Sequence, residues 1–252
     1  YQNNVGIALQ KMCQFSQALK AYNRAITLNP NYFEAYLNSA STLQIQNKFE
    51  LALKACNKAL ELNPRYAEAY NCKGNILLKL DKPELAVQEF ISAIKLDPAQ
   101  AHYFLNRGIC YEHLSQFQKA YNDYNESEKI NPTDQLLIVK QMGLHAKLCD
   151  WSVFLKRKNL VPSLGMGETA IPPFNLLLFE DAPERHLVRA QNYASAHFGK
   201  PMQSNPQIIK KKKRLHIAYM SADFHNFAGM HLMIGLLENH NKEKFKISAF
   251  SY

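Results

Sequence analysis

The sequence lacks the features that assign a protein to several common classes. No run of about 18 apolar residues is present, so we expect no membrane-spanning helix and no membrane partner. The five cysteines form no C-x-x-C pair and no metal-ligand spacing, so no metal site is predicted. A glycine-rich phosphate loop is also missing, and no cofactor is expected. The single tryptophan, Trp151, is expected to anchor a hydrophobic core.

The cysteines are interpreted as structural residues. They are odd in number and scattered through segments with a helical pattern, and free thiols suit a reducing compartment such as the cytoplasm. We expect each to be a small buried hydrophobic residue in helix packing. The five are Cys13, Cys56, Cys72, Cys110 and Cys149.

Positive charge is concentrated in one stretch of an otherwise ordinary globular composition, with 47% hydrophobic and 20% charged residues. Residues 1–132 hold 14 Lys and Arg against 12 Asp and Glu, and residues 133–252 hold 16 against 9. Six of those basic residues lie in residues 200–214, which contain no acid. Because no aromatic residue is interleaved with Lys210–Lys213, we interpret residues 200–213 as a solvated linker and predict no nucleic-acid partner.

A regular repeat organises the chain up to Pro132. Prolines recur at one constant spacing, each after Asn or Asp, and we call this spacing one period: Pro30, Pro64, Pro98 and Pro132. Small residues recur with the same period in three columns: Gly6, Ala40, Gly74 and Gly108; Ala18, Ala52, Ala86 and Ala120; and Ala25, Ala59, Ala93 and Ser127. A period of this length indicates a supersecondary unit that is stacked into a solenoid.

Each period predicts two amphipathic helices. In the second repeat, apolar residues at steps of three and four place helix A over Phe33–Gln46 and helix B over Phe49–Leu62. Proline ends each unit, because it has no N–H and clashes with a continuing helical turn. The small columns mark places where helices approach to about 8–10 Å.

Aromatic residues complete a pattern that resembles the tetratricopeptide repeat. They are Tyr22, Phe90 and Tyr124 in one column and Tyr36, Tyr70 and Phe104 in another. Cys56 replaces the aromatic residue of the first column in the second repeat, and Ser127 replaces an alanine. We therefore interpret residues 1–132 as four tetratricopeptide repeats in a mainly α superhelix.

One column of the A helices predicts a concave groove that holds protein or peptide substrates. It reads Asn4, Asn38, Cys72, Asn106. Because a side-chain amide can pair with both the N–H and the C=O of an extended peptide, Asn4, Asn38 and Asn106 are candidate peptide-binding residues. The alternative is that these asparagines only stabilise the repeats. A clamp for a C-terminal carboxylate is not favoured, since the positions assigned to the groove hold no Lys or Arg: Glu34, Glu68, Asn3, Leu37, Asn71 and Leu105.

The sequence predicts that the period stops at Thr133. We expect residues 133–199 to form a helical region that caps the solenoid and connects it to the rest of the chain. Its expected elements are a helix over Leu136–Leu148, an amphipathic stretch over Phe154–Leu160, a loop over Pro162–Pro173 and a helix over Ala182–Phe198.

Residues 214–252 predict the first βαβ unit of a second domain. A strand over Leu215–Ser221, a helix over His231–His240 and a strand from Phe245 should give parallel strands with a right-handed crossover. Ligands of such folds lie beyond the carboxyl ends of the strands, so the turn at residues 221–229 is the place to look for chemistry.

That turn and its flanks resemble the opening of the catalytic domain of the O-GlcNAc transferase and SPINDLY family. The resemblance is carried by Ser221-Ala-Asp-Phe-His-Asn-Phe-Ala-Gly-Met-His-Leu-Met233. Cys149-Asp150-Trp151 and Pro172-Pro173-Phe174 are similar to bacterial members. The resemblance implies a Rossmann-like GT-B lobe and metal-free transfer of a sugar to Ser or Thr hydroxyls of proteins. The donor would be UDP-N-acetylglucosamine, or a fucose donor in the SPINDLY branch.

The resemblance also implies candidate catalytic residues. His231 matches one histidine of the family's turn, and the other interpretation is that it only packs or caps a helix. Phe227 stands where the family has a second histidine, so the nearby His225 is the second candidate. The family's second lobe has no counterpart here, so these 252 residues alone are not expected to catalyse transfer.

The residues leave two hypotheses open. The first is an N-terminal fragment of a bacterial-type, cytoplasmic protein O-GlcNAc transferase, whose repeat arm binds protein substrates. The second is a non-catalytic repeat scaffold with a degenerate transferase remnant, which Phe227 favours.

Overall fold

The computed structural model describes residues 1–167 and 169–198 and the backbone of residues 215–221 and 245–251. The chain divides into two compact units between Lys200 and Pro201, and each unit is described by itself. In the described part of the chain, no helix is long and apolar enough to cross a membrane.

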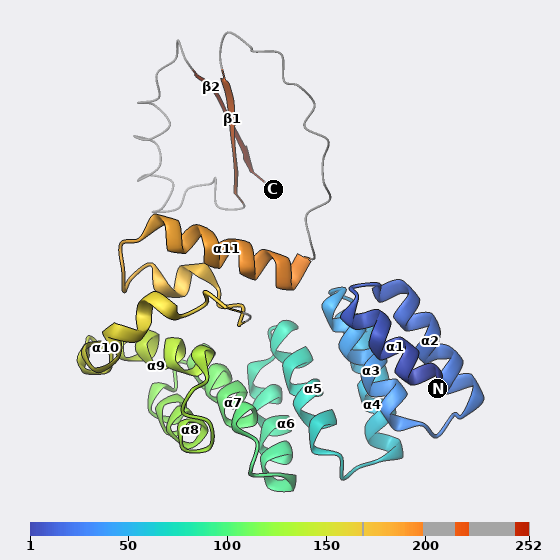
Figure 1. Ribbon diagram of the computed structural model, residues 1–252. Helices are drawn as coiled ribbons and strands as arrows, with labels where there is room; N and C mark the ends of the chain where they lie inside the picture. Colours follow the sequence, from blue (N-terminus) through green and yellow to red (C-terminus); the bar gives the residue numbers. More distant parts are fainter. Residues whose placement is uncertain (168, 199–214, 222–244, 252) are drawn as a thin grey trace. The chain divides into compact units, whose positions relative to one another are not determined.

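Residues 1–132 fold into four helical pairs, one in each period of the sequence (Figure 1). The predicted helices of the second repeat agree with the structure to within one residue. The A and B helices of the pairs are α1 (Gln2–Lys11) and α2 (Phe15–Leu28), α3 (Phe33–Ile45) and α4 (Phe49–Leu62), α5 (Ala67–Lys79) and α6 (Pro83–Leu96), and α7 (Ala101–His113) and α8 (Phe117–Ile130).

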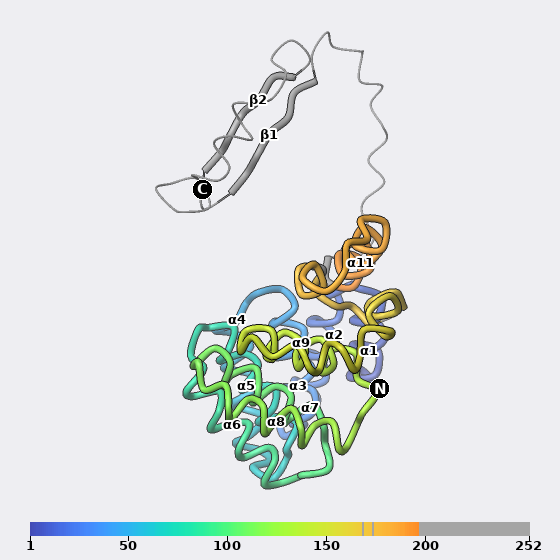
Figure 2. Tube along the Cα trace, turned by 90° about the vertical axis from the view of Figure 1, so that its left-hand side faces the viewer, coloured from blue at the N-terminus to red at the C-terminus, as the bar shows by residue number. Residues whose placement is uncertain are grey.

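The pairs stack through both kinds of helix. Each helix B contacts the helix A of the next pair, and successive A helices contact one another, α1 with α3, α3 with α5 and α5 with α7. The A helices therefore lie side by side along one side of the repeat layer (Figures 1 and 2). We call the surface that they form the A-helix face.

A size rule governs the contact between helix A and helix B of each pair. A Cβ atom added at Gly74 would lie 2.7 Å from the ring of Phe90, which is closer than packed atoms come. Where the ring is replaced by Cys56, the helix A position holds alanine and both residues lie in one buried cluster. The four pairs are Gly6 with Tyr22, Ala40 with Cys56, Gly74 with Phe90 and Gly108 with Tyr124.

A tight turn in the left-handed conformation ends each helix A. Positive φ angles of 56° to 58° recur one period apart, at Cys13, Asn47, Asp81, Ser115 and Cys149. At each turn the next residue donates its N–H to the carbonyl of the helix's last turn, as Lys48 does to Leu43, which closes the helix terminus. Because these turns lie at the surface, Cys13 and Cys149 are exposed, and the prediction that they are buried was wrong. Cys56, Cys72 and Cys110 are buried, as predicted.

The turn at Cys149 shows that the repeat geometry continues after Thr133. Helix α9 (Gln135–Lys147) begins one period after α7, packs on α8 and ends in the same kind of turn, so it is a fifth helix A. The helix predicted over Leu136–Leu148 is therefore present, and its backbone keeps the repeat geometry although the sequence period stops at Thr133. The sequence period is lost there because Met142 occupies the small-residue position.

Three short helices pack around α9: α10 (Ser152–Arg157) and the 3-10 helices η1 (Lys158–Ser163) and η2 (Pro173–Leu176). The longer helix α11 (Pro183–Phe198) packs on η2. The buried cluster between them consists of Ile138, Val139, Met142, Val161, Leu164, Ile171, Leu176 and Phe179. Trp151 touches Phe179 only at the rim and stays 43% exposed, so the prediction of a core anchor was wrong. The space against α9 is filled by this cluster, to which Trp151 does not belong.

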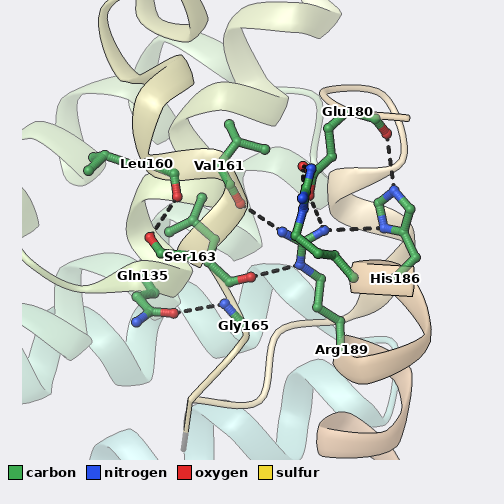
Figure 3. Close-up of polar contacts among 10 residues, drawn as sticks. Gln135, Leu160, Val161, Ser163, Gly165, Glu180, His186 and Arg189 are labelled. Atoms are coloured by element: carbon green, nitrogen blue, oxygen red, sulfur yellow. Dashed lines mark hydrogen bonds and ion pairs between the residues drawn. The ribbon is translucent and has the colours of Figure 1, made fainter. Parts of the chain in front are cut away.

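A buried arginine fastens α11 to this region (Figure 3). Arg189 is completely buried and donates hydrogen bonds of 2.7 Å to the carbonyl oxygens of Val161 and Leu164. Glu180 forms an ion pair with the same guanidinium. Burial alone opposes ionisation of Glu180, but Arg185 and Arg189 outweigh it and hold the pKa of this carboxyl below its ordinary value.

The second unit contains the strands β1 (Leu215–Ser221) and β2 (Phe245–Ser251). They pair in parallel, with Leu215 opposite Phe245 and Ser221 opposite Ser251. A parallel pair needs a crossover connection. The helix predicted over His231–His240 lies outside the described residues, so the βαβ unit and its handedness stay predictions.

The size rule predicts the outcome of a double-mutant cycle. Gly74→Ala should lower the free energy of unfolding by about 1–3 kcal/mol, because the methyl group overpacks against the Phe90 ring. Phe90→Cys should lower it by about 3–5 kcal/mol through the cavity that it leaves. The double variant reproduces the Ala40–Cys56 pair, so urea unfolding should show a favourable coupling of about 1 kcal/mol or more. Strictly additive losses would contradict the rule.

The arginine contact predicts a second stability difference. Arg189→Met should cost about 3–5 kcal/mol, because Glu180 and two carbonyl groups stay buried without this partner. Arg185→Met is the matched control: its side chain also binds Glu180 but is 42% exposed, so we expect a loss below about 1 kcal/mol. Denaturant unfolding of the two variants measures the difference, and equal losses would refute the special role of Arg189.

Candidate functional site

The A-helix face carries the column that was predicted to bind peptides. Its four predicted positions, each one period from the next, lie in α1, α3, α5 and α7. Asn38 and Asn106 are half-buried, Cys72 is buried, and Asn4 is exposed. Asn38 and Asn106 therefore occupy equivalent surroundings, which Asn4 does not share.

Asn38 and Asn106 each bind a buried asparagine of the preceding helix A. The Nδ2 atom of Asn38 donates to Oδ1 of Asn3 at 2.9 Å, and that of Asn106 donates to Oδ1 of Asn71 at 2.9 Å. We call each pair a rung. Asn3 and Asn71 are only 5% and 4% exposed, so each needs the partner that the next repeat supplies. The rungs thus give the asparagines a stabilising role.

The same two amides keep unused hydrogen-bonding groups. An amide side chain has two N–H donors and an acceptor oxygen, and Asn38 and Asn106 each use one donor in a rung. In the part of the chain that the structure describes, no partner engages their other N–H or their Oδ1 atom. One free donor beside one free acceptor is the combination that an extended peptide backbone pairs with.

Cys72 interrupts the column for a packing reason. The position that Asn3 and Asn71 occupy in other repeats is held by Leu37, and Leu37 and Cys72 lie in one apolar cluster, each 7% exposed. An amide there would face a side chain that cannot bond it. The adjacent Cys56 thiol and burial raise the pKa of Cys72, so it is a neutral thiol. Each asparagine that forms a rung thus lies opposite an asparagine, whereas Cys72 lies opposite the apolar Leu37.

A polar network supports the rung between α5 and α7. Asn71 donates to Glu68 Oε1 at 2.9 Å, and the Tyr103 hydroxyl donates to Oε2 at 3.1 Å. The His102 Nε2 atom lies 3.3 Å from the same oxygen. Burial opposes ionisation of Glu68, but His102 and the other hydrogen bonds outweigh it and lower its pKa. Glu68 is therefore charged at neutral pH and orients Asn71 towards Asn106.

Asn3 and Asn71 were predicted to face the groove, but the structure buries them as rung partners. One further member of the column was not predicted. Lys140 of α9 lies one period after Asn106, and its Nζ atom is 3.6 Å from Oε2 of Glu112 on α7. Lys147 lies 3.7 Å from the other carboxylate oxygen. Counting one more period from Asn106 would have found Lys140.

An open hollow of about 750 Å³ lies between the end of η2 and the start of α11. It has two acids: Asp181 is exposed, and Glu180 is held by Arg185 and Arg189. His186 Nε2 lies 3.0 Å from the Glu180 carbonyl oxygen. Much of the remaining wall is exposed leucine: Leu177, Leu178 and Leu187. Its polar lining residues are Glu180, Asp181 and His186, and none of them is an amide that offers a donor beside an acceptor.

The candidate catalytic residues His225 and His231, and the replaced position Phe227, lie outside the described residues. Their roles stay predictions. Among the residues that the structure does describe, no group of three His, Cys, Asp or Glu side chains is placed to hold a metal ion.

Comparison with known proteins identifies the repeats. Family models described as tetratricopeptide repeat match residues 1–32, 33–66, 55–88 and 73–134. No curated protein matches the chain.

Solved structures share the fold. MamA from Desulfovibrio magneticus RS-1, from residue 41 to its end, has a TM-score of 0.58 at 19% identity over 64% of this chain and 94% of that one. A second MamA structure has a TM-score of 0.54 at 20% identity, covering 68% and 96%. YrrB, described as a TPR protein with an unusual peptide-binding site, has a TM-score of 0.51 at 16% identity, covering 75% and 88%. At these identities the likeness concerns the fold alone. Over residues 1–134, more than half of its length, the chain belongs to the tetratricopeptide-repeat family.

Proposed function

We propose that the chain binds extended peptide segments of other proteins on the A-helix face. The observation that supports this best is the unused N–H and Oδ1 on each of the half-buried amides of Asn38 and Asn106. The fold agrees with it, since YrrB is described as having a peptide-binding site. Contacts to the peptide backbone demand no particular side chain, so the surface should accept many sequences.

The two rungs define where such a peptide lies. They are two repeats apart, with the apolar pair of Leu37 and Cys72 between them. A peptide that pairs with both amides must therefore cross the A helices from α3 over α5 to α7. Asn4 has no equivalent rung, and its predicted contact is the least supported of the three.

Exchanging a whole rung tests this proposal without leaving a buried amide unpaired. Asn3→Leu with Asn38→Cys copies the neighbouring pair of Leu37 and Cys72, so the free energy of unfolding should change by less than about 1 kcal/mol. Binding of fluorescein-labelled Ser- and Thr-rich twelve-residue peptides, measured by polarisation, should weaken by about 5-fold or more, because one donor and one acceptor are lost.

The control is Asn38→Cys alone. It leaves Asn3 buried without its partner and should lower the free energy of unfolding by about 1–3 kcal/mol. Unchanged peptide affinity in the stable double variant would overturn the proposed role of the rung, whatever the single variant does.

We further propose that in the complete protein this arm presents Ser and Thr side chains to a cytoplasmic glycosyltransferase that uses UDP-N-acetylglucosamine. Support comes from the resemblance of the turn after β1 to the O-GlcNAc transferase and SPINDLY family, together with the parallel pairing of β1 and β2 that a Rossmann-like lobe requires. A repeat scaffold without activity is the alternative, and Phe227 favours it.

The enzymatic proposal predicts turnover by the full-length protein. Incubation with UDP-N-acetylglucosamine and a Ser- and Thr-rich peptide should release UDP and raise the mass of the peptide by one sugar. Phe227→His, which restores the family's residue, should increase the rate by about 10-fold or more if the histidine acts as an acid, a base or a positioning group. His231→Ala should reduce it. If neither the wild-type protein nor any variant transfers sugar, the alternative of a repeat scaffold without activity is favoured.

A further inference from the structure

We propose that Lys140 binds a carboxylate of the peptide held by Asn38 and Asn106, so that this protein prefers segments with an acidic residue at the α9 end of the A-helix face. This rests on the peptide-binding function proposed above. It adds a chemical preference to a surface that otherwise contacts only the peptide backbone.

The position of Lys140 carries the first step. It occupies in α9 the place that Asn38 and Asn106 occupy in α3 and α7, and each of the three side chains reaches a residue of the preceding helix A. A peptide that runs past the asparagines along the A helices therefore meets Lys140 next. The side chain is 25% exposed, so part of it is open to solvent.

The charges around Lys140 carry the second step. Lys140 and Lys147 share a single carboxylate, that of Glu112, at 3.6 and 3.7 Å. Both distances exceed the roughly 2.7–2.9 Å of a strong charged hydrogen bond, so neither ammonium group is fully engaged. Two positive charges against one negative charge leave a net attraction for an anion.

Two carboxylates, together with the exposed Lys11 and Lys79, lie on the A helices that precede α9. Glu34 on α3 and Glu68 on α5 have no Lys or Arg partner among the described residues. An acidic residue of the ligand would be repelled beside Glu34 and Glu68 and attracted beside Lys140. The preference should therefore appear at one end of a bound peptide and not at the other.

Glu112 offers a way to increase the effect without disturbing the fold. Burial raises the pKa of Tyr124, and the neighbouring Glu112 carboxylate raises it further. In the first repeat, the equivalent of Glu112 is Gln10, which accepts a 2.9 Å hydrogen bond from the Tyr22 hydroxyl. Glutamine is therefore a suitable neighbour for a tyrosine at this position of helix B. Glu112→Gln should free both lysines while keeping the packing.

A glutamate scan tests the proposal on the whole chain. The probe is a fluorescein-labelled twelve-residue peptide of Ser, Thr and Gln, in which one Gln at a time is replaced by Glu. We expect one terminal region of the peptide to give a gain in affinity of about 3- to 5-fold at low salt. The gain should vanish in Lys140→Met, should grow in Glu112→Gln, and should fade at about 0.5 M NaCl.

A control variant distinguishes failure of the acidic preference from failure of the peptide-binding function. Lys58→Met removes the same charge from α4, outside the A-helix face, and should leave the gain intact. If the parent peptide of Ser, Thr and Gln binds and no Glu position improves its affinity, or if Lys140→Met keeps the gain, the proposed preference is wrong while peptide binding stands. If the parent peptide does not bind at all, the peptide-binding function itself fails.

Discussion

The contact between a helix B ring and the bare backbone of helix A is the constraint on which the arm depends. At Gly74 the ring of Phe90 takes the space that a side chain would need, so the two helices pack closely. Repeating that pair in every period brings the A helices into contact with one another. The rungs need this stacking, because their amide groups lie on successive A helices and are 2.9 Å apart.

Within that frame, the A helices are matched in polarity as well as size. A buried asparagine at position 3 or 71 is tolerated because the next repeat presents an amide, whereas Leu37 is met by a thiol. Unpaired buried amides cost about 1–3 kcal/mol, so a change on one side requires a change on the other. What looks in the sequence like a defect in an asparagine column is therefore a compensated pair.

The helices, their ends and the register of the columns could be predicted from the sequence, because they depend on local periodicity and on proline. Three features could not. The partners of Asn38 and Asn106 depend on how one repeat stacks on the next, which no local pattern encodes. Helix α9 lost the small residues that mark a helix A while keeping its geometry. Arg189 bonds to carbonyl groups 25 and 28 residues away, and a carbonyl acceptor leaves no mark in the residue types.

Asn38 and Asn106 each use one N–H to stabilise the stacking of repeats and keep the other N–H and the Oδ1 atom for a ligand. This limits where the arm can contact a ligand. Where two A helices stack, the amides of the column lie opposite another asparagine, as at Asn38 and Asn106, which are two repeats apart. At the fifth helix A the opposing position is Leu105, which an amide could not bond. Lysine solves this differently, because its long apolar stem suits an apolar neighbour while its ammonium group reaches Glu112 further along α7. The column therefore changes from an amide at Asn106 to a charged group at Lys140 for the same reason that it changes to a thiol at Cys72. In both cases the residue opposite, on the preceding helix A, is apolar.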